Sequence, residues 1–194
     1  MVRLDSSDPQ FTADFARLLT VKREIAEDVD EAVRGIIGDV VARGDTALVE
    51  FTRRFDRLGA EFSAENLRVT DAEITAAVAA CPAESLDALR LAAERIESFH
   101  RAQRPTDHRA TDALGVTAGW RWTALESVGL YVPGGTASYP SSVLMNALPA
   151  RVAGVPRLVM VVPTPDGQMN PLVLAAAQLA GVHEVYRVGG AQAV

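Results

Sequence analysis

The feature that most constrains the fold is a strand–helix unit that repeats between residues 128 and 194. The segments "VGLYVP", "RLVMVVP" and "EVYRVGG" are predicted strands that start at Val128, Arg157 and Glu184, 29 and 27 residues apart. Between them, "SSVLMNALPARVAG" and "NPLVLAAAQLAG" are predicted helices. This spacing is typical of βαβ units. Because the strands are nearly continuous apolar runs, we expect a parallel sheet covered on both faces, with right-handed crossovers.

The ends of the two helices carry ordinary stop and start signals. Gly154 ends the first helix, while Asn170 caps the second, Pro171 lies in its first turn and Gly181 ends it. After the third strand, "GGAQAV" is typical of the turn into a third helix. The predicted strands and helices would leave a sheet edge and apolar surface uncovered, so we expect a fragment of a longer protein or a partner-dependent half.

The first half of the chain has a different pattern. Residues 8–104 favour helices, the first capped by Asp8 and the next, "IAEDVDEAVRGIIGDVVARGD", ended by Gly44. "TALVEFTRRFD" is a third helix and "NLRVT" a short extended piece. Thr70 or Asp71 starts another helix, Pro82 ends it, and "ESLDALRLAAERIESFHRAQR" is the last.

Residues 105–112 are expected to form a loop between the two halves. After it, "GVTAGWRWTALESVGLYVP" is rich in Val, Thr, Trp and Tyr and partly alternates, which predicts two strands. The fold class expected for the whole chain is therefore α/β: a helical first half followed by an incomplete Rossmann-like parallel βαβαβ sheet.

Composition excludes several classes of function. The 194 residues are 48% hydrophobic and 23% charged, with a formal net charge of -6. No Lys/Arg cluster with interleaved aromatics is present, so we expect no nucleic-acid partner. No apolar run approaches the ~20 residues that cross a bilayer, so we expect no membrane partner. The start "MVRLDSSDPQF" is unlike a signal peptide, and a cytoplasmic location is the default expectation.

Cysteine and histidine give little sign of chemistry. Cys81 is the only cysteine, which excludes an intrachain disulfide and a thiolate-cluster metal site; a buried, inert thiol is expected. His100, His108 and His183 show no metal-ligand spacing and no HExxH motif, so each is expected to be structural. We therefore predict neither catalytic nor metal-ligating residues in this chain.

Two Gly-Gly turns follow predicted parallel strands, at the sheet edge where open α/β sheets bind ligands. Glycines let a ligand approach the backbone, and hydroxyls near a helix start can cap it or bind an anion. Neither turn fits the GxGxxG or P-loop pattern, so a tight strand–turn–helix connection remains an alternative. The residues concerned are Gly134, Gly135, Ser141, Ser142, Gly189, Gly190 and Gln192.

Longer motifs carry a resemblance to a known family. "GLYVPGGTASYPSSVLMNALPARVAGVPRLVMVVPTP" and "AAAQLAGVHEVYRVGGAQAV" resemble the histidinol dehydrogenases. "VARGDTALVEFTRRFD" and "AAERIESFHRAQR" are similar to the amino-terminal region of that family. The resemblance covers nearly the whole chain, but only about the first half of a typical member.

The resemblance implies a reaction and an assembly. The family oxidises L-histidinol through the aldehyde to L-histidine, the last steps of histidine biosynthesis, using two NAD⁺ in turn, with Zn²⁺ helping to hold the substrate. Members are homodimers with two Rossmann-like domains and sites completed across the subunit interface. The implied division is residues 1–23 as an arm, 24–129 as the first part of a discontinuous domain, and 130–194 as an incomplete second domain.

The resemblance also implies which site residues are present. The family's NAD contacts map onto Tyr131 of "LYVPGG" and Gln192 of "GGAQA". Its zinc ligands and its Glu-His acid–base pair belong to the missing half. Each of the two mapped residues has a structural alternative, a half-buried strand aromatic or a polar residue at a helix start.

Competing functions remain open on the sequence. The chain is the amino-terminal part of a histidinol dehydrogenase, or a truncated, non-catalytic fragment that binds nucleotide weakly or only associates with other chains. An unrelated small α/β binding protein is a third alternative. Because an enzyme needs a base within ~3 Å of the proton it removes, we expect residues 1–194 alone to be inactive toward histidinol.

Overall fold

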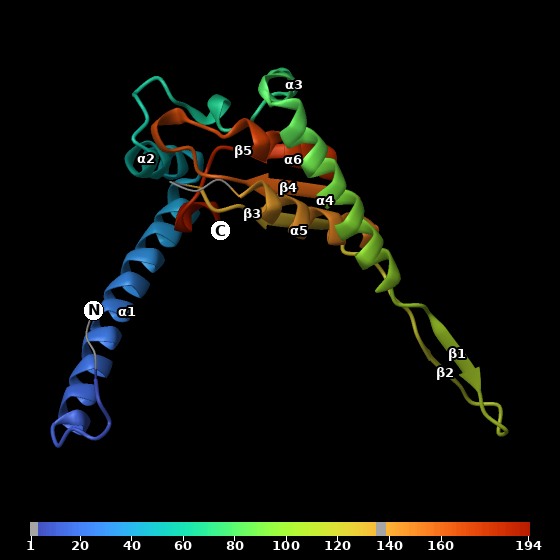
Figure 1. Ribbon diagram of the computed structural model, residues 1–194, viewed down its shortest axis with the longest axis horizontal. Helices are drawn as coiled ribbons and strands as arrows, with labels where there is room; N and C mark the ends of the chain where they lie inside the picture. Colours follow the sequence, from blue (N-terminus) through green and yellow to red (C-terminus); the bar gives the residue numbers. More distant parts are fainter. Residues whose placement is uncertain (1–3, 135–138) are drawn as a thin grey trace.

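The computed structural model of the protein describes residues 4–134 and 139–194, and only the backbone of residues 20–27. A compact body carries two projections that point away from it, the first part of helix α1 and a hairpin (Figure 1). The helices of the first half are α1 (Phe11–Arg43), α2 (Asp45–Asp56), the short η1 (Ala64–Asn66), α3 (Asp71–Ala80) and α4 (Ala83–Ala102).

The repeated strand–helix unit is confirmed between residues 127 and 193. Strand β3 pairs with β4 and β4 with β5, both in parallel, so the strand order is β3-β4-β5. Asn170 caps α6 by accepting a hydrogen bond from the Leu172 N–H, and Gly154 and Gly181 end the two helices in the left-handed conformation. The elements are β3 (Ser127–Tyr131), α5 (Pro140–Ala153), β4 (Arg157–Val161), η2 (Pro165–Gly167), α6 (Pro171–Ala180), β5 (Glu184–Tyr186) and η3 (Ala191–Ala193).

The main core lies on one face of this sheet. Leu130, Met160 and Val185 point from the three strands into a buried cluster that also holds residues of α5 and α6. Helices α3 and α4 pack on α5 and α6 as a further layer. Both crossover helices therefore lie on the same face, as expected when successive parallel strands are added in one direction.

The opposite face differs from the expected full cover. A small cluster that includes Val49 of α2, Val161 of β4 and Tyr186 of β5 covers its carboxyl end. Toward the amino end, Gly129 is exposed and Val159 only half-buried. The prediction of a sheet covered on both faces is thus wrong for the described residues, because α2 reaches only the carboxyl ends of the strands.

The extended piece "NLRVT" joins the two halves of the chain. Val69 donates its N–H to the Val185 carbonyl at 2.8 Å, and Arg187 donates to the Leu67 carbonyl at 2.7 Å. Arg68 and Tyr186 form an antiparallel bridge. The first half therefore pairs with the outer edge of β5. The next helix begins where expected, with Thr70 and Glu73 forming a reciprocal capping box at α3.

The expected loop at residues 105–112 is partly wrong. His108–Thr111 forms strand β1, which pairs antiparallel with β2 (Thr117–Trp120) in the projecting hairpin of Figure 1. Asp112 shapes the turn, where its carboxylate accepts hydrogen bonds from the N–H groups of Leu114 and Val116, both at 2.9 Å. The strand lacks apolar alternation because both of its faces are exposed, so no periodic pattern marks it as a strand.

The first two predicted helices form the single helix α1. No proline or glycine separates them, so the backbone continues through residues 20–24. Asp8 is not the N-cap residue of α1, because Gln10 occupies that position. Asp8 lies in the turn before the helix, where it accepts hydrogen bonds from the N–H groups of Gln10 and Phe11.

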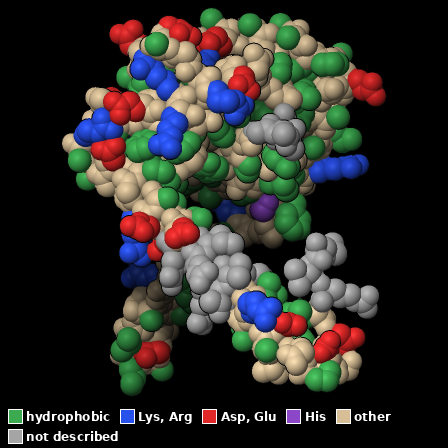
Figure 2. All heavy atoms as spheres, turned by 90° about the vertical axis from the view of Figure 1, so that its left-hand side faces the viewer, with side chains coloured by type: hydrophobic (Ala, Val, Ile, Leu, Met, Phe, Trp, Pro, Cys, Tyr) green, Lys and Arg blue, Asp and Glu red, His purple; other side chains and the backbone are tan. Residues whose placement is uncertain are grey.

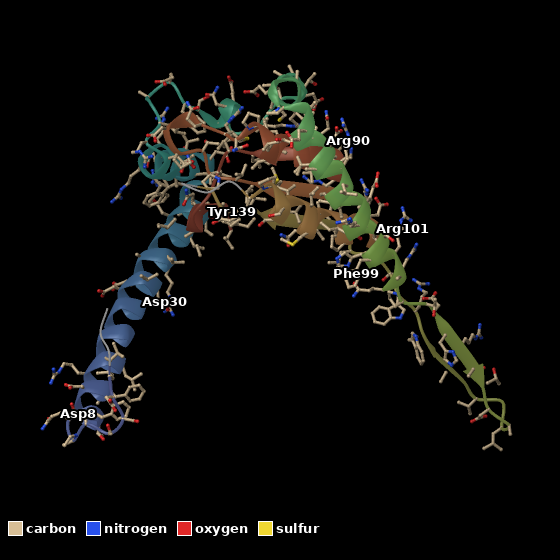
Figure 3. The ribbon with its side chains drawn as sticks, viewed as in Figure 1. Asp8, Asp30, Arg90, Phe99, Arg101 and Tyr139 are labelled. Atoms are coloured by element: carbon tan, nitrogen blue, oxygen red, sulfur yellow. The ribbon has the colours of Figure 1, made fainter. Side chains whose placement is uncertain are left out.

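The surface carries charges of both signs. On the face seen in Figure 2, Lys and Arg side chains lie among Asp and Glu. Arg90 and Arg101 point outward from α4 in Figure 3 and pair with acidic residues of the same helix. Within the described part of the chain, no helix is long and apolar enough to cross a membrane.

Candidate functional site

Three turns meet at the carboxyl edge of the sheet, because β3, β4 and β5 run parallel. Pro163 follows the middle strand and lies between the glycines of the two outer turns. A Cβ placed on Gly134 would lie 2.5 Å from Pro163 Cγ, and one on Gly189 would lie 2.4 Å from Pro163 Cβ. Carbon atoms at rest are ~3.5–4.0 Å apart, so both positions require glycine for close packing against the proline.

Tyr131 and Gln192, the two cofactor-binding residues predicted from the resemblance, meet at Gly190. The Tyr131 hydroxyl accepts a hydrogen bond from the Gly190 N–H at 2.8 Å, which links the end of β3 to the turn after β5. Tyr131 stays 45% exposed, whereas Gln192 is only 6% exposed. Gly190 has a φ of 64°, and a Cβ there would lie 2.6 Å from Gln192 Oε1.

Gln192 holds an unusual polar atom. Its Oε1 is buried and has no hydrogen-bond partner among the residues that the structure describes. Buried polar atoms are nearly always paired, so an unpaired one is a place where a ligand or water can bind. The exposed Tyr131 ring and this amide oxygen therefore provide an aromatic surface and a polar acceptor close to one glycine turn.

The first glycine turn is only partly described. Gly135, a predicted ligand contact, lies outside the described residues. Ser141 and Ser142 do not cap α5 as expected: they lie inside its first turn, because Pro140 starts the helix and Tyr139 takes the N-cap position without a side-chain cap. Their role as anion donors is a prediction that nothing in the structure bears on.

Sequence reasoning missed a second group of residues beneath this edge. Asp56, the last residue of α2, is 5% exposed, and its Oδ2 accepts a hydrogen bond from the Thr164 N–H at 2.6 Å. Burial raises the pKa of the Asp56 carboxyl, and the Thr164 hydrogen bond lowers it in part. In the sequence, this contact is marked only by a carboxylate at the end of the "RRFD" helix and by the "VVPTP" turn. Neither pattern predicts that the two segments are in contact.

The remaining titratable candidates have structural surroundings. Among the described residues, no three His, Cys, Asp or Glu side chains are placed to hold a metal ion. Cys81 is half-buried rather than buried, and its thiol donates to the Ala77 carbonyl at 3.3 Å. The rings of His108 and Trp120 lie 4.5 Å apart in the hairpin, and His100 contacts Phe99.

These features define an α/β protein with an open parallel sheet, and glycine turns lie along the carboxyl edge of that sheet. A sequence model described as histidinol dehydrogenase matches residues 19–194 of this chain. The chain belongs to the histidinol dehydrogenase family.

Two curated histidinol dehydrogenases show how close the relationship is. The one from Rhodopseudomonas palustris is 62% identical over 193 residues, which is 100% of this chain and 44% of the relative. The one from Bradyrhizobium diazoefficiens is 65% identical with the same coverage. The chain therefore spans less than half the length of these relatives.

A solved structure agrees with the fold. The crystal structure of histidinol dehydrogenase from Elizabethkingia anophelis superposes with a TM-score of 0.78 at 33% identity, covering 85% of this chain and 37% of that chain. The α/β class and the family membership are both confirmed.

Proposed function

We propose that this chain supplies the nucleotide-binding edge of a histidinol dehydrogenase, which oxidises L-histidinol to L-histidine in two NAD-dependent, zinc-assisted steps. The observation that carries the proposal is the meeting of Tyr131 and the buried, unpaired amide of Gln192 at Gly190. Membership of the family and high identity to curated members support it.

The residues at this edge fit a nucleotide. Tyr131 is exposed enough to contact a ring or ribose. Gln192 Oε1 is unpaired but buried, so it can accept a hydrogen bond from a hydroxyl or amide of the cofactor once its side chain turns toward the edge. Gly134 lets its turn pack closely against Pro163, and Gly190 lets the backbone lie against Gln192 Oε1. When bound, NAD⁺ accepts the hydride that the oxidation releases. The chain's own residues bind and orient it there.

Zinc does not fit the described residues. None of them form a cluster of metal-ligating side chains, and the described histidines have the structural contacts above or are scattered. A catalytic zinc site usually needs about three protein ligands. We therefore place the zinc ligands and the acid–base pair outside this chain and derive no step through the metal. Two copies of the chain would lack the same groups.

Further parts of the proposal follow from the family resemblance. We propose a homodimer in the cytoplasm, with residues 1–23 as an arm, 24–129 as the first part of one domain and 130–194 as the start of another. Helix α1 runs across position 23 and β3 across position 129, so neither proposed boundary coincides with a break in secondary structure.

The test is NAD⁺ titration of a family-length protein, in which the carboxyl-terminal part of a relative follows this chain. Tyr131→Phe keeps the ring and removes the hydroxyl that accepts from Gly190, while Tyr131→Ala removes both. Gln192→Ala removes the unpaired amide. Losing a hydrogen bond of this kind costs about 0.5–1.5 kcal/mol, so we expect each Ala variant to weaken NAD⁺ about threefold or more.

Gln103→Ala is the matched control, because Gln103 is the C-cap residue of α4, on the side of the molecule that leads to the hairpin. It should leave the affinity unchanged. Unchanged affinity in both Tyr131→Ala and Gln192→Ala would reject the site.

A further inference from the structure

Asp56 lies in a position that its own helix does not favour. It is the last residue of α2, where the helix dipole is negative and a carboxylate is unfavourable. It is also 5% exposed, and a buried carboxylate is costly unless it is hydrogen-bonded. Its partner is the Thr164 N–H, 108 positions away in the sequence. The reason for this residue therefore lies outside α2, in the turn that it holds.

The turn after β4 has few other means of attachment. Pro163 and Pro165 flank Thr164 and have no N–H, so the Thr164 N–H is the only backbone donor in these three residues. Asp56 accepts that hydrogen bond at 2.6 Å. A charge-assisted hydrogen bond of this kind is stronger than a neutral one. Asp56 thus holds the turn at its single backbone donor.

A second contact fixes the same two segments. Arg57, next to Asp56, makes a two-point ion pair with Asp166, with nitrogen–oxygen distances of 2.7 and 2.5 Å. Arg57 and Asp166 have φ values of 57° and 56°, a conformation that non-glycine residues rarely adopt. Two consecutive residues at the end of α2 therefore bind the turn after β4. Both residues of the ion pair adopt an unfavourable backbone conformation.

The turn that Asp56 holds contains Pro163, which separates the two glycine turns. The ring of Pro163 lies against Gly134 on one side and Gly189 on the other. A proline ring cannot rotate away, so its position sets the separation of the two glycine turns. Gly190, which binds Tyr131 and adjoins Gln192, directly follows Gly189.

We propose that Asp56 is a positioning residue for the nucleotide edge: its carboxylate fixes the β4 turn, and Pro163 in that turn sets the spacing of the glycine turns that receive NAD⁺. The role of the edge rests on the proposed function above. Asp56 touches neither substrate nor cofactor in this proposal. It acts through Thr164 and Pro163.

The test compares three variants of the family-length protein in steady-state kinetics with NAD⁺ and histidinol. Asp56→Ala removes the acceptor, and we expect the KM for NAD⁺ to rise about tenfold, within the range typical of residues that act on a site through intervening contacts, with kcat changed less. Asp56→Asn keeps an oxygen that can accept from Thr164 and should restore the KM to within about threefold of the parent.

Thr52→Ala is the matched control. Thr52 is fully buried one turn earlier on α2 and donates only to the Leu48 carbonyl in the described structure. Its loss should lower the thermal midpoint without changing the KM. A KM for Asp56→Ala within about twofold of the parent, or an equal rise in Thr52→Ala, overturns the positioning role, because a general loss of stability would then explain the data.

The Tyr131→Ala and Gln192→Ala titrations separate this inference from the proposed function. If they weaken NAD⁺ and Asp56→Ala does not, only the positioning role is wrong. If they leave the affinity unchanged, the nucleotide lies elsewhere and both proposals are wrong.

Discussion

The packing of Pro163 against Gly189 predicts a measurable cost for a single methyl group. In Gly189→Ala the new Cβ would lie 2.4, 2.7 and 3.0 Å from Cβ, Cγ and Cδ of Pro163. Ordinary carbon contacts begin near 3.5 Å, so the overlap is roughly 1 Å against a ring that cannot rotate away. Overpacking of this kind costs ~1–3 kcal/mol.

A neighbouring glycine gives the opposite expectation. Gly129 in β3 has open space around it, because a Cβ there meets no atom within 4 Å. Alanine is favoured over glycine in regular structure by ~0.5–1 kcal/mol, through backbone entropy. The entropy gain is common to both variants, so the overpacking cost alone sets the difference between them. Gly129→Ala should therefore be more stable than Gly189→Ala by ~1–3 kcal/mol.

Urea unfolding followed by circular dichroism measures both variants against the parent chain. We expect Gly189→Ala to unfold at lower urea and Gly129→Ala at equal or higher urea, with the same slope. If Gly189→Ala is as stable as Gly129→Ala, Pro163 does not limit the space at this edge, and the reasoning about its packing is wrong.

Other predictions test the core, the electrostatics and the chemistry. Leu144→Ala, at a fully buried site on α5, should lower the free energy of unfolding by about 2–5 kcal/mol in the same urea assay. Hydrogen bonds from Arg157 lower the pKa of Glu184 from 4.5 to about 2, so this pair's stabilisation is present above pH 4.5 and lost as the pH falls toward 2. Glu184→Gln should therefore flatten the unfolding free energy over that range in acid titrations. The 194-residue chain, supplied with Zn²⁺, NAD⁺ and histidinol, should form NADH no faster than a blank without protein; histidinol-dependent turnover would contradict our placement of the reacting groups.

Local signals predicted the repeated unit well. Asn170, Gly154 and Gly181 sit at the helix ends that their chemistry favours, and Thr70 lies at the expected start of α3. These residues act on neighbours a few positions away, so a sequence pattern can contain the whole interaction. The hairpin strand His108–Thr111 was missed because its partner strand, not its own pattern, makes it extended.

The candidate site was less accessible to sequence reasoning. The Gly-Gly turns mark the edge and include Gln192, but Tyr131 was chosen by family resemblance alone, and its contact with Gly190 joins residues 59 positions apart. Nothing in the sequence around Pro163 predicts that its ring packs against two glycines from other turns. Long-range packing of this kind becomes visible only when the strands are aligned in three dimensions.

The contacts beneath the edge also bear on how the two halves of the chain depend on each other. Asp56 and Leu67 come from the helical half, yet one holds the β4 turn and the other pairs with the residue after β5. The main core likewise mixes Ile74 and Ala93 of that half with the strands and helices after residue 127. A nucleotide edge built only from residues 128–194 would lack the acceptor for Thr164, the strand-like partner of β5 and part of its own core. The helical half is therefore a structural part of the proposed nucleotide site, and substitutions at the end of α2 can alter cofactor binding without any contact with the cofactor.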